Sequence, residues 1–298
     1  MRIGICCSGV GEAAAPTFVK ASAQAAEQAG FSTIWIGEHV VLFERYPESH
    51  YPYVGDYGTD VPIPDPTTPI IDPIIAATWI AGVTSSIQVG SGILILPQRN
   101  PVVLAKALAT LDVLSGGRLV LGAGIGWCKE EYDAVGVPWE GRGRRMDENL
   151  AAMRALWRDT ASSFHGETVS FDRAYCYPKP VRNSDIPILI GGESDLALKR
   201  VARYGDGWIA FKLSPEEAPA RIDRLRALAR EQDRDADALR IVVGIFSNTS
   251  EDDLKRYRDA GVTEFNLVTA GELPLDDAGV RAGIADFGRR FVDVVAKL

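Results

Sequence analysis

The 298-residue sequence has no long hydrophobic run, since no stretch reaches the ~18 consecutive apolar residues that a membrane-spanning helix needs. Its N-terminus, Met1 to Cys7, also has no apolar stretch long enough for a secretory signal peptide. These two absences argue against a membrane protein and against secretion. We therefore expect a cytoplasmic protein with no membrane partner.

Cysteine and histidine are scarce, with four and three residues respectively. The cysteines are Cys6, Cys7, Cys128 and Cys176, and no two of them form a CxxC pair. Without a secretion signal, we expect them to be reduced thiols with mostly structural roles. The sequence also has no HxH or HExxH pattern, so we expect no metal site.

Basic residues do not dominate, because 32 Lys and Arg stand against 40 Asp and Glu, a formal net charge of -8. An acidic surface argues against binding to the phosphate backbone of a nucleic acid. No GxSxG motif is present, so nothing indicates an α/β-hydrolase. A small-molecule substrate stays compatible with this charge, because a local pocket can differ from the whole surface.

What the sequence does contain is a regular alternation of short apolar segments and amphipathic helical segments. The expected strands are Arg2–Cys7, Thr33–Gly37, Ile87–Ile93, Arg118–Gly122, Ile186–Ile190, Gly207–Phe211, Ile241–Ile245 and Glu264–Val268. The expected helices are Pro16–Gln28, Pro101–Leu114, Met146–Trp157, Ser194–Tyr204, Pro215–Arg230, Ser250–Ala260 and Asp277–Ala296. Strands this continuous in apolar residues are typical of parallel sheets covered on both faces. Eight such units predict an α/β fold, a (β/α)8 TIM barrel formed as a single domain over residues 1–298.

Two segments interrupt this rhythm. Phe43–Asp72, rich in Pro and Tyr, follows the second strand, and Ala161–Pro180 precedes the fifth. A long loop in a compact domain is usually a lid or a binding loop. The first segment contains Tyr46, Tyr51, Tyr53 and Tyr57, and such tyrosines argue against disorder. The second segment alternates in polarity around His165-Gly166, which predicts a β-hairpin.

In a barrel of this type, the residues directly after each strand form the ligand-binding mouth. Glu38 and His39 follow the second strand, where a histidine can act as a general acid or base. The third strand runs into Gly90, Gly92 and Ile93. Glycines there indicate either a bulge that approaches a flat ligand closely or tight packing inside the barrel.

The fourth strand ends in Gly122-Ala123-Gly124-Ile125-Gly126-Trp127. This GxGxG spacing differs from the GxGxxG of dinucleotide-binding folds, so we reject a Rossmann fold and expect a ligand to lie against these small residues. The fifth strand ends in Gly191-Gly192-Glu193-Ser194, before a helix. A glycine turn into a helix N-terminus suits a phosphate, with Glu193 offering only its backbone, although Ser194 is also an ordinary N-cap.

Together these residues resemble the luciferase-like monooxygenase superfamily, and within it the actinobacterial oxidoreductases that depend on the deazaflavin coenzyme F420. The similarity covers nearly the whole chain. Its most specific positions are Pro97–Pro101, Ala105-Lys106, Thr110–Asp112, Ser115–Arg118, Gly122–Trp127, Glu130-Glu131, Gly136–Pro138, Arg142–Arg145, Pro178–Pro180, Gly191-Gly192 and Gly205–Trp208. The resemblance implies a barrel enzyme with a redox cofactor.

The resemblance also implies roles for particular residues. The cofactor ring stacks over a bulge after the third strand, often with a non-proline cis peptide, which here corresponds to Gly92-Ile93. The residues expected to contact or face the cofactor are Glu38, His39, Ile125, Gly126 and Glu130 around the ring, and Gly191, Gly192, Glu193 and Ser194 at the phosphate. Some relatives carry a carboxylate directly after the strand-four glycines as a proton donor. Trp127 stands there in this chain, which leaves His39 as the best candidate for the catalytic proton.

The expected function is hydride transfer between F420 and a small organic substrate. Two alternatives stay open: an FMN-dependent luciferase-like monooxygenase using reduced flavin and O2, and a non-catalytic protein that binds a flavin or deazaflavin. The acidic tail of F420 would favour basic residues at the mouth, with candidates Arg142, Arg144, Arg145, Lys179 and Lys212. The residues themselves indicate neither the substrate nor the oligomeric state, but the resemblance implies a homodimer because relatives are commonly dimers.

Overall fold

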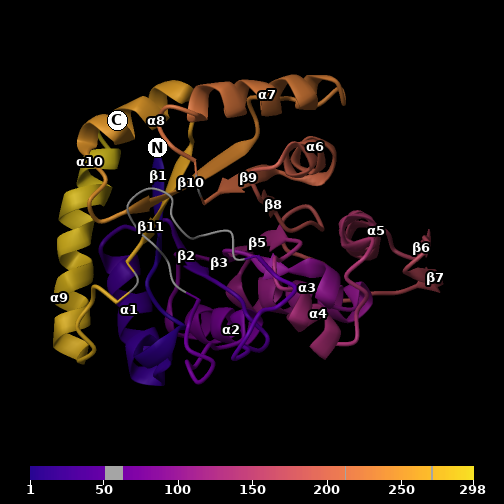
Figure 1. Ribbon diagram of the computed structural model, residues 1–298, viewed down its shortest axis with the longest axis horizontal. Coiled ribbons are helices and arrows are strands. Elements are labelled where there is room, and N and C mark those ends of the chain that lie inside the picture. Colours follow the sequence, from indigo (N-terminus) through magenta and orange to yellow (C-terminus); the bar gives the residue numbers. More distant parts are fainter. Residues whose placement is uncertain (51–62, 212, 270) are drawn as a thin grey trace.

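The computed structural model describes residues 1–50, 63–211, 213–269 and 271–298. Its central feature is a ring of eight parallel strands in the order β2-β1-β11-β10-β9-β8-β5-β3, and the pairing of β3 with β2 closes the ring. Helices surround this ring, as Figure 1 shows. The predicted (β/α)8 TIM barrel is confirmed.

All of the predicted strands are present, with ends that differ by no more than two residues. The ring consists of β1 (Arg2–Cys6), β2 (Thr33–Ile36), β3 (Gln88–Ser91), β5 (Leu119–Gly124), β8 (Ile188–Gly191), β9 (Gly207–Ala210), β10 (Arg240–Phe246) and β11 (Glu264–Val268). A short strand, β4 (Leu94–Ile95), continues β3 beyond a break and also pairs with β5. The predicted strand Ile87–Ile93 therefore ends earlier than expected, at a bulge.

The helices are α1 (Pro16–Gln28), α2 (Pro73–Val83), α3 (Pro101–Ser115), α4 (Lys129–Ala134), α5 (Arg142–Arg158), α6 (Asp195–Tyr204), α7 (Ala218–Arg230), α8 (Glu251–Ala260), α9 (Asp277–Phe287) and α10 (Asp293–Val295). No amphipathic pattern indicates α2 in the sequence, because this helix is apolar on all sides. The predicted helix Asp277–Ala296 is interrupted by a π-helical turn at Gly288–Val292. Among the described residues, no helix combines the length and apolar character needed to cross a membrane.

The two predicted insertions lie where expected. After β2, residues 63–72 run beside the end of β1, since Gly11 N–H donates to the Pro69 carbonyl at 2.8 Å and Ile71 N–H donates to the Gly9 carbonyl at 3.0 Å. Before β8, the predicted hairpin consists of β6 (Ser162–His165) and β7 (Ser170–Ala174). The sequence positions Tyr51, Tyr53, Tyr57 and Lys212 lie outside the described residues.

One aromatic side chain fills the middle of the barrel. Trp35 of β2 is fully buried. It packs with apolar side chains from other strands, namely Val120, Leu189, Ile209 and Val242. Gly4 and Gly90 make room for it, because a Cβ atom at these positions would lie 2.5 and 2.6 Å from the indole. Of the two explanations for Gly90, the structure supports tight packing.

Side chains along β2 alternate between the inside and the outside of the barrel. Thr33 faces inward, where its hydroxyl donates to the Glu264 carboxylate at 3.2 Å, and Trp35 takes the next inward position. The two isoleucines of the strand belong to the outer hydrophobic core. Strand β2 ends at Ile36, and Glu38 and His39 follow it at the mouth of the barrel.

Candidate active site

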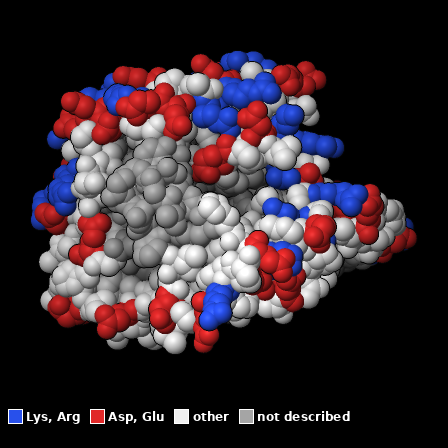
Figure 2. All heavy atoms as spheres, viewed as in Figure 1, with Lys and Arg blue, Asp and Glu red and all other residues white. Residues whose placement is uncertain are grey.

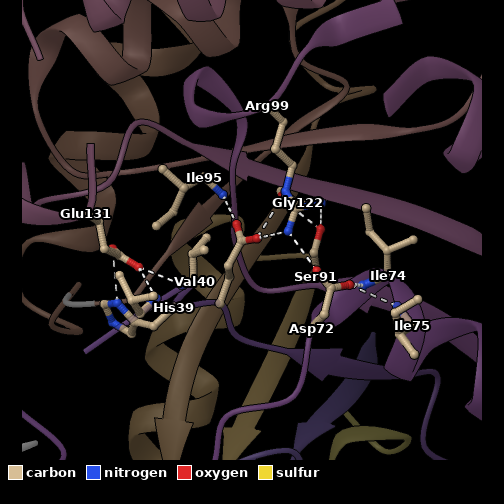
Figure 3. A network of polar contacts seen from close by, with 12 residues as sticks. His39, Val40, Asp72, Ile74, Ile75, Ser91, Ile95, Arg99, Gly122 and Glu131 are labelled. Carbon is tan, nitrogen blue, oxygen red and sulfur yellow. Dashed lines mark hydrogen bonds and ion pairs between the residues drawn. The ribbon is translucent and has the colours of Figure 1, made fainter. Parts of the chain in front are cut away.

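Glu38 lies at the end of β2 and is enclosed by an ion pair. Its carboxylate accepts hydrogen bonds from Ile95 N–H and from the Arg99 guanidinium, and only 1% of the side chain is exposed. Arg99 also donates to Asp72 at 2.9 Å, and Asp72 caps the start of α2 (Figure 3). Burial raises the pKa of the Glu38 carboxyl, while the Arg99 charge opposes this shift. The hydrogen bonds of Glu38 join the end of β2 to the β3–α3 connection, and its place near the reactive face of a ring stays a prediction.

His39, the next residue, is held by a different carboxylate. Its Nδ1 lies 3.2 Å from Glu131 Oε2, and the other oxygen, Glu131 Oε1, accepts a hydrogen bond from Val40 N–H at 2.6 Å (Figure 3). The Glu131 side chain is 1% exposed, whereas the His39 side chain is 20% exposed. The imidazole is thus anchored on one side and open on another, as a proton-transferring group must be.

Aromatic rings extend this arrangement along the rim of the mouth. The rings of His39 and Trp127 meet edge to face with their centroids 5.7 Å apart, and Tyr46 lies 5.4 Å from Trp127 on a centroid basis. Phe43 in turn lies 5.9 Å from Tyr46. Trp127, which replaces the carboxylate of some relatives, therefore packs between the candidate proton donor and the loop after β2.

Glu130 contacts that loop. Its carboxylate accepts hydrogen bonds from the Ser49 hydroxyl and, at 3.0 Å, from Glu48 N–H. The Ser49 hydroxyl also accepts from Lys129 N–H at 2.7 Å, and Lys129 Nζ lies 3.1 Å from the Glu48 carboxylate. Partial burial opposes ionisation, but the hydrogen bonds from Ser49 and Glu48 hold the pKa of Glu130 below its usual value. In this structure Glu130 therefore binds the loop after β2, and its contact with a cofactor stays a prediction.

The bulge after β3 has the predicted geometry, with a cis peptide bond between Gly92 and Ile93. Ile93 stays partly exposed and lies over two glycines of neighbouring strands. An added Cβ atom would lie 2.5 Å from Ile93 at Gly124 and 2.9 Å from it at Gly191. At Gly122 the added atom would lie only 1.9 Å from the Ser91 carbonyl oxygen. The β5 glycines therefore make room for the bulge itself, which corrects the expectation that they leave space for a ligand.

Ile125 and Gly126 follow β5 at the same rim. Gly126 has a φ of +70°, and a Cβ atom there would lie 2.9 Å from Ile95. The Ile125 carbonyl accepts a short hydrogen bond of 2.5 Å from the Tyr132 hydroxyl of α4. These contacts keep the chain after β5 close to the bulge, at the border of the mouth.

The backbone at Gly37, beside the bulge, has open space next to it. A Cβ atom at Gly37 would meet only the Gly92 carbonyl oxygen, at an ordinary contact distance of 3.9 Å. The partly exposed Ile93 supplies an apolar surface next to this glycine-lined backbone. Glycine backbone and an aliphatic side chain fit one face of a planar ring such as that of a flavin or deazaflavin.

The predicted phosphate site lies at the start of α6. Ser194 caps the helix, since its hydroxyl accepts a hydrogen bond from Ala197 N–H at 3.1 Å. Gly192 has a φ of +117°, and the Glu193 carboxylate accepts from Phe211 N–H at 2.9 Å, so Glu193 turns its side chain to the protein. The Asp195 charge is paired with Arg221 at 2.7 Å. The first-turn N–H groups, which have no intrahelical acceptors, fit a phosphate, although Ser194 also serves as the ordinary cap.

The candidate basic residues have partners within the protein. Arg142 stacks on Trp139 at 3.5 Å from the ring centroid, and Arg144 pairs with Glu167 at 2.8 Å. Arg145 donates to the Pro138 carbonyl at 2.8 Å, and Lys179 donates to the carbonyls at the end of α5. Figure 2 shows basic side chains gathered over the α6 and α7 side of this face, among acidic ones. Lys179 therefore caps a helix, which corrects its expected role at the mouth.

A cavity of about 290 Å³ reaches His39 from the Arg99 side of β2. Its lining residues are Glu38, His39, Val40, Ile70, Asp72, Pro73, Gln98, Arg99 and Val135. Sequence reasoning missed Arg99, Asp72 and above all Glu131 as parts of this region. The only available signal was the Glu130-Glu131 pair, and adjacent positions on a helix cannot show which carboxylate turns to the histidine.

The cysteines are free thiols, as expected from the sequence. Burial raises the pKa of Cys6 to about 11 and that of Cys7 to about 12. Burial also raises the pKa of Cys128 to about 11. A thiol with so high a pKa stays protonated near neutral pH and is a poor nucleophile. Among the described residues, no cluster of three or more His, Cys, Asp or Glu side chains could hold a metal ion.

Comparison with known proteins places these features in a family. A family model described as "Luciferase-like monooxygenase" matches residues 1–283. An uncharacterized protein of Mycobacterium tuberculosis is 34% identical over 249 residues, which cover 83% of each chain. The FMNH(2)-dependent dimethylsulfone monooxygenase of Pseudomonas putida is 31% identical over 210 residues, covering 70% of this chain and 52% of that enzyme.

Among solved structures, an F420-dependent secondary alcohol dehydrogenase in complex with an F420-acetone adduct has a similar fold. It matches with a TM-score of 0.77 at 18% sequence identity, over 99% of this chain and 98% of the other. At this identity the likeness concerns the fold. Together with the family match over most of the sequence, it leads to one conclusion: the chain belongs to the luciferase-like monooxygenase family and is an oxidoreductase.

Proposed function

We propose that this protein is an F420-dependent oxidoreductase that transfers a hydride between the deazaflavin and a small organic substrate. The observation that carries the proposal is the His39–Glu131 pair, which holds an imidazole at the mouth with 3.2 Å between Nδ1 and Oε2. The F420-specific part is supported by the sequence motifs and by the fold shared with an F420-dependent alcohol dehydrogenase.

When bound, the cofactor would supply the site that takes up or releases the hydride, and the protein would orient the reactants. Ile93 and the backbone at Gly92 would support one face of the ring, with Ile125 and Gly126 at its border. Gly191, Gly192 and Ser194 would hold the phosphate through the first turn of α6. Glu38 would act indirectly, because its ion pair with Arg99 fixes the end of the strand that carries His39.

His39 would handle the proton that accompanies the hydride. An imidazole can accept a proton from a hydroxyl group or return one to a carbonyl oxygen near neutral pH. The neighbouring rings of Trp127 and Tyr46 would exclude water from this side of the mouth. No carboxylate stands directly after the β5 glycines to share this task.

An FMN-dependent monooxygenase is the second candidate, and the 31% identical dimethylsulfone monooxygenase favours it. Both cofactors combine a tricyclic ring with a phosphate, so the bulge and the start of α6 suit either one. A non-catalytic flavin-binding or deazaflavin-binding protein is the third candidate, but the His39–Glu131 pair, with its carboxylate buried and its imidazole partly exposed, supports proton transfer.

Titration of the purified protein with F420 and with FMN, followed by cofactor fluorescence, tests the proposal. We expect F420 to bind at least tenfold more tightly than FMN. Tighter binding of FMN would replace the proposed function by the monooxygenase. Binding of F420 without reduction or oxidation of any compound that reaches the site would favour the non-catalytic alternative.

We also propose that the protein forms a homodimer through the outer face of α2 and α3. These adjacent helices expose apolar side chains to an unusual extent, namely Ile75, Trp79, Val102, Val103, Val113 and Leu114. Helix α2 contains no charged residue. The face is mainly apolar, with the exposed Lys106 of α3 as a charged residue on it, and such a face can pair with a second copy of itself, as a two-fold interface requires.

A further inference from the structure

Hydrogen bonds hold both carboxylate oxygens of Glu131 in place. Oε1 accepts from Val40 N–H at 2.6 Å and from Val41 N–H at 3.4 Å. Oε2 lies 3.2 Å from His39 Nδ1, and the side chain is only 1% exposed. A carboxylate accepts hydrogen bonds and donates none, so the ring nitrogen that faces it must carry the proton.

We propose that Glu131 is a positioning residue that keeps neutral His39 protonated on Nδ1 and leaves Nε2 as the proton acceptor towards the mouth. The inference rests on the proposed function, because it assigns which atom of His39 exchanges the proton. A carboxylate that orients a histidine base in this way sets both its tautomer and its direction. The edge contact with Trp127, at 5.7 Å between centroids, limits rotation of the ring on its other side.

This arrangement selects a substrate class. A free Nε2 lone pair suits a substrate that carries a hydroxyl group when reduced and a carbonyl group when oxidised. In oxidation, Nε2 would accept the O–H proton while the C–O bond becomes a double bond, and the C–H bond would break with its electron pair as a hydride that the bound cofactor would take up. In reduction, the hydride arrives at the carbonyl carbon while Nε2–H returns its proton to the oxygen.

Nitrogen-15 NMR of protein labelled at histidine tests the inference directly, because the chain has only three histidines. In the wild-type protein with a neutral imidazole, we expect His39 to carry its proton on Nδ1. In Glu131→Gln, Val40 N–H will hold the amide oxygen, so the amide NH2 group will face Nδ1. An NH2 group donates, and we therefore expect the proton of His39 to move to Nε2 in this variant.

Glu130→Gln is the matched control, because the neighbouring carboxylate contacts Glu48 and Ser49 instead of His39. We expect this variant to keep the proton on Nδ1. A wild-type protein with the proton on Nε2, or a folded Glu131→Gln variant that retains it on Nδ1, overturns the inference. If Glu131→Gln does not fold, the position of the His39 proton in the wild-type protein still tests the inference.

The tautomer is measured without cofactor or substrate, so its outcome is separate from that of the proposed function. Weak F420 binding would contradict the proposed function but would not change the measured tautomer of His39. Cofactor-linked turnover of a compound with neither a hydroxyl nor a carbonyl group, at the same rate in the wild type and in Glu131→Gln, would overturn the assigned substrate class.

Discussion

At the scale of single residues, two pairs of adjacent residues each combine a structural contact with a contact at the candidate active site. Glu38 closes an ion pair with Arg99, while His39 opens to the mouth and is held by Glu131. On α4, Glu130 holds the loop after β2 and Glu131 holds His39. Rotation along the helix separates Glu130 from Glu131, because adjacent side chains on a helix point in different directions. Glu38 and His39 show a similar separation directly after β2.

The role of His39 gives the first prediction. The variant His39→Asn should bind F420 within a factor of about three of the wild type and lose roughly 10²- to 10⁴-fold in turnover, the usual contribution of a general acid or base. Fluorescence titration measures the binding, and the rate of cofactor oxidation or reduction measures turnover. Wild-type turnover in this variant would show that His39 handles no proton in the reaction.

The ion pair of Glu38 gives the second prediction. In Glu38→Ala, Arg99 loses its buried partner but keeps Asp72, so the free energy of unfolding should fall by about 2–3 kcal/mol, less than the roughly 3–5 kcal/mol of a fully buried pair. Denaturant titration measures this change. The control Glu48→Ala removes an exposed partner of Lys129 and should cost under about 1 kcal/mol. Equal losses in the two variants would contradict the structural role of Glu38.

At the scale of elements, the packing of β3 against β5 depends on glycine at position 122, which has no side chain. A Cβ atom at Gly122 would lie 1.9 Å from the Ser91 carbonyl oxygen, and the Ser91 hydroxyl bridges both backbone groups of Gly122 at 2.7 and 3.0 Å. Gly122→Ala should therefore destabilise the barrel by more than about 3 kcal/mol or prevent folding.

The matched control for this third prediction is Gly37→Ala. Its Cβ atom would lie 3.9 Å from the Gly92 carbonyl oxygen, which is ordinary contact, so the variant should fold with a change of only about 0.5 kcal/mol. Thermal unfolding followed by circular dichroism compares the two. A stable Gly122→Ala protein would mean that β3 and β5 are farther apart than the structure places them.

Glu27 connects α1 to the turn before β3, and its carboxylate gives the fourth prediction. Partial burial opposes ionisation of Glu27, but N–H groups of Ser85, Ser86 and Ile87 and the Ser86 hydroxyl donate to it and lower its pKa to about 2. A lowered folded-state pKa stabilises the fold above the unfolded value of 4.5 and loses this effect as pH falls towards 2. Glu27→Gln should cost about 1 kcal/mol at pH 7, after allowance for solvent screening.

Denaturant titrations at pH 7 and at acid pH measure this effect. The difference between the wild type and Glu27→Gln should shrink steadily as pH falls through the window between 4.5 and about 2. If the difference in unfolding free energy between the two proteins stays constant over this range, the charge of the Glu27 carboxylate does not stabilise the contact between α1 and the turn.

At the scale of the whole molecule, the apolar face of α2 and α3 gives the fifth prediction. The wild type should sediment with twice the chain mass of 32.3 kDa, and Val103→Glu should sediment as a single chain, because it places a charge at the centre of the interface. The control Leu196→Glu changes an equally exposed apolar residue on α6 and should remain dimeric. Dimeric Val103→Glu or monomeric wild type would exclude this interface.

The sequence by itself determined the barrel, because strand and helix periods are local patterns and the apolar residues of each segment predict that it is buried. Through the family resemblance it also predicted the cis peptide at Gly92-Ile93, which the structure contains, and it proposed His39 as the catalytic residue. Only the tertiary structure decided which of two adjacent carboxylates holds His39, why the glycines of β5 are there, and that Lys179 caps a helix. These features depend on contacts between residues far apart in the chain, such as His39 with Glu131, and no local pattern specifies them.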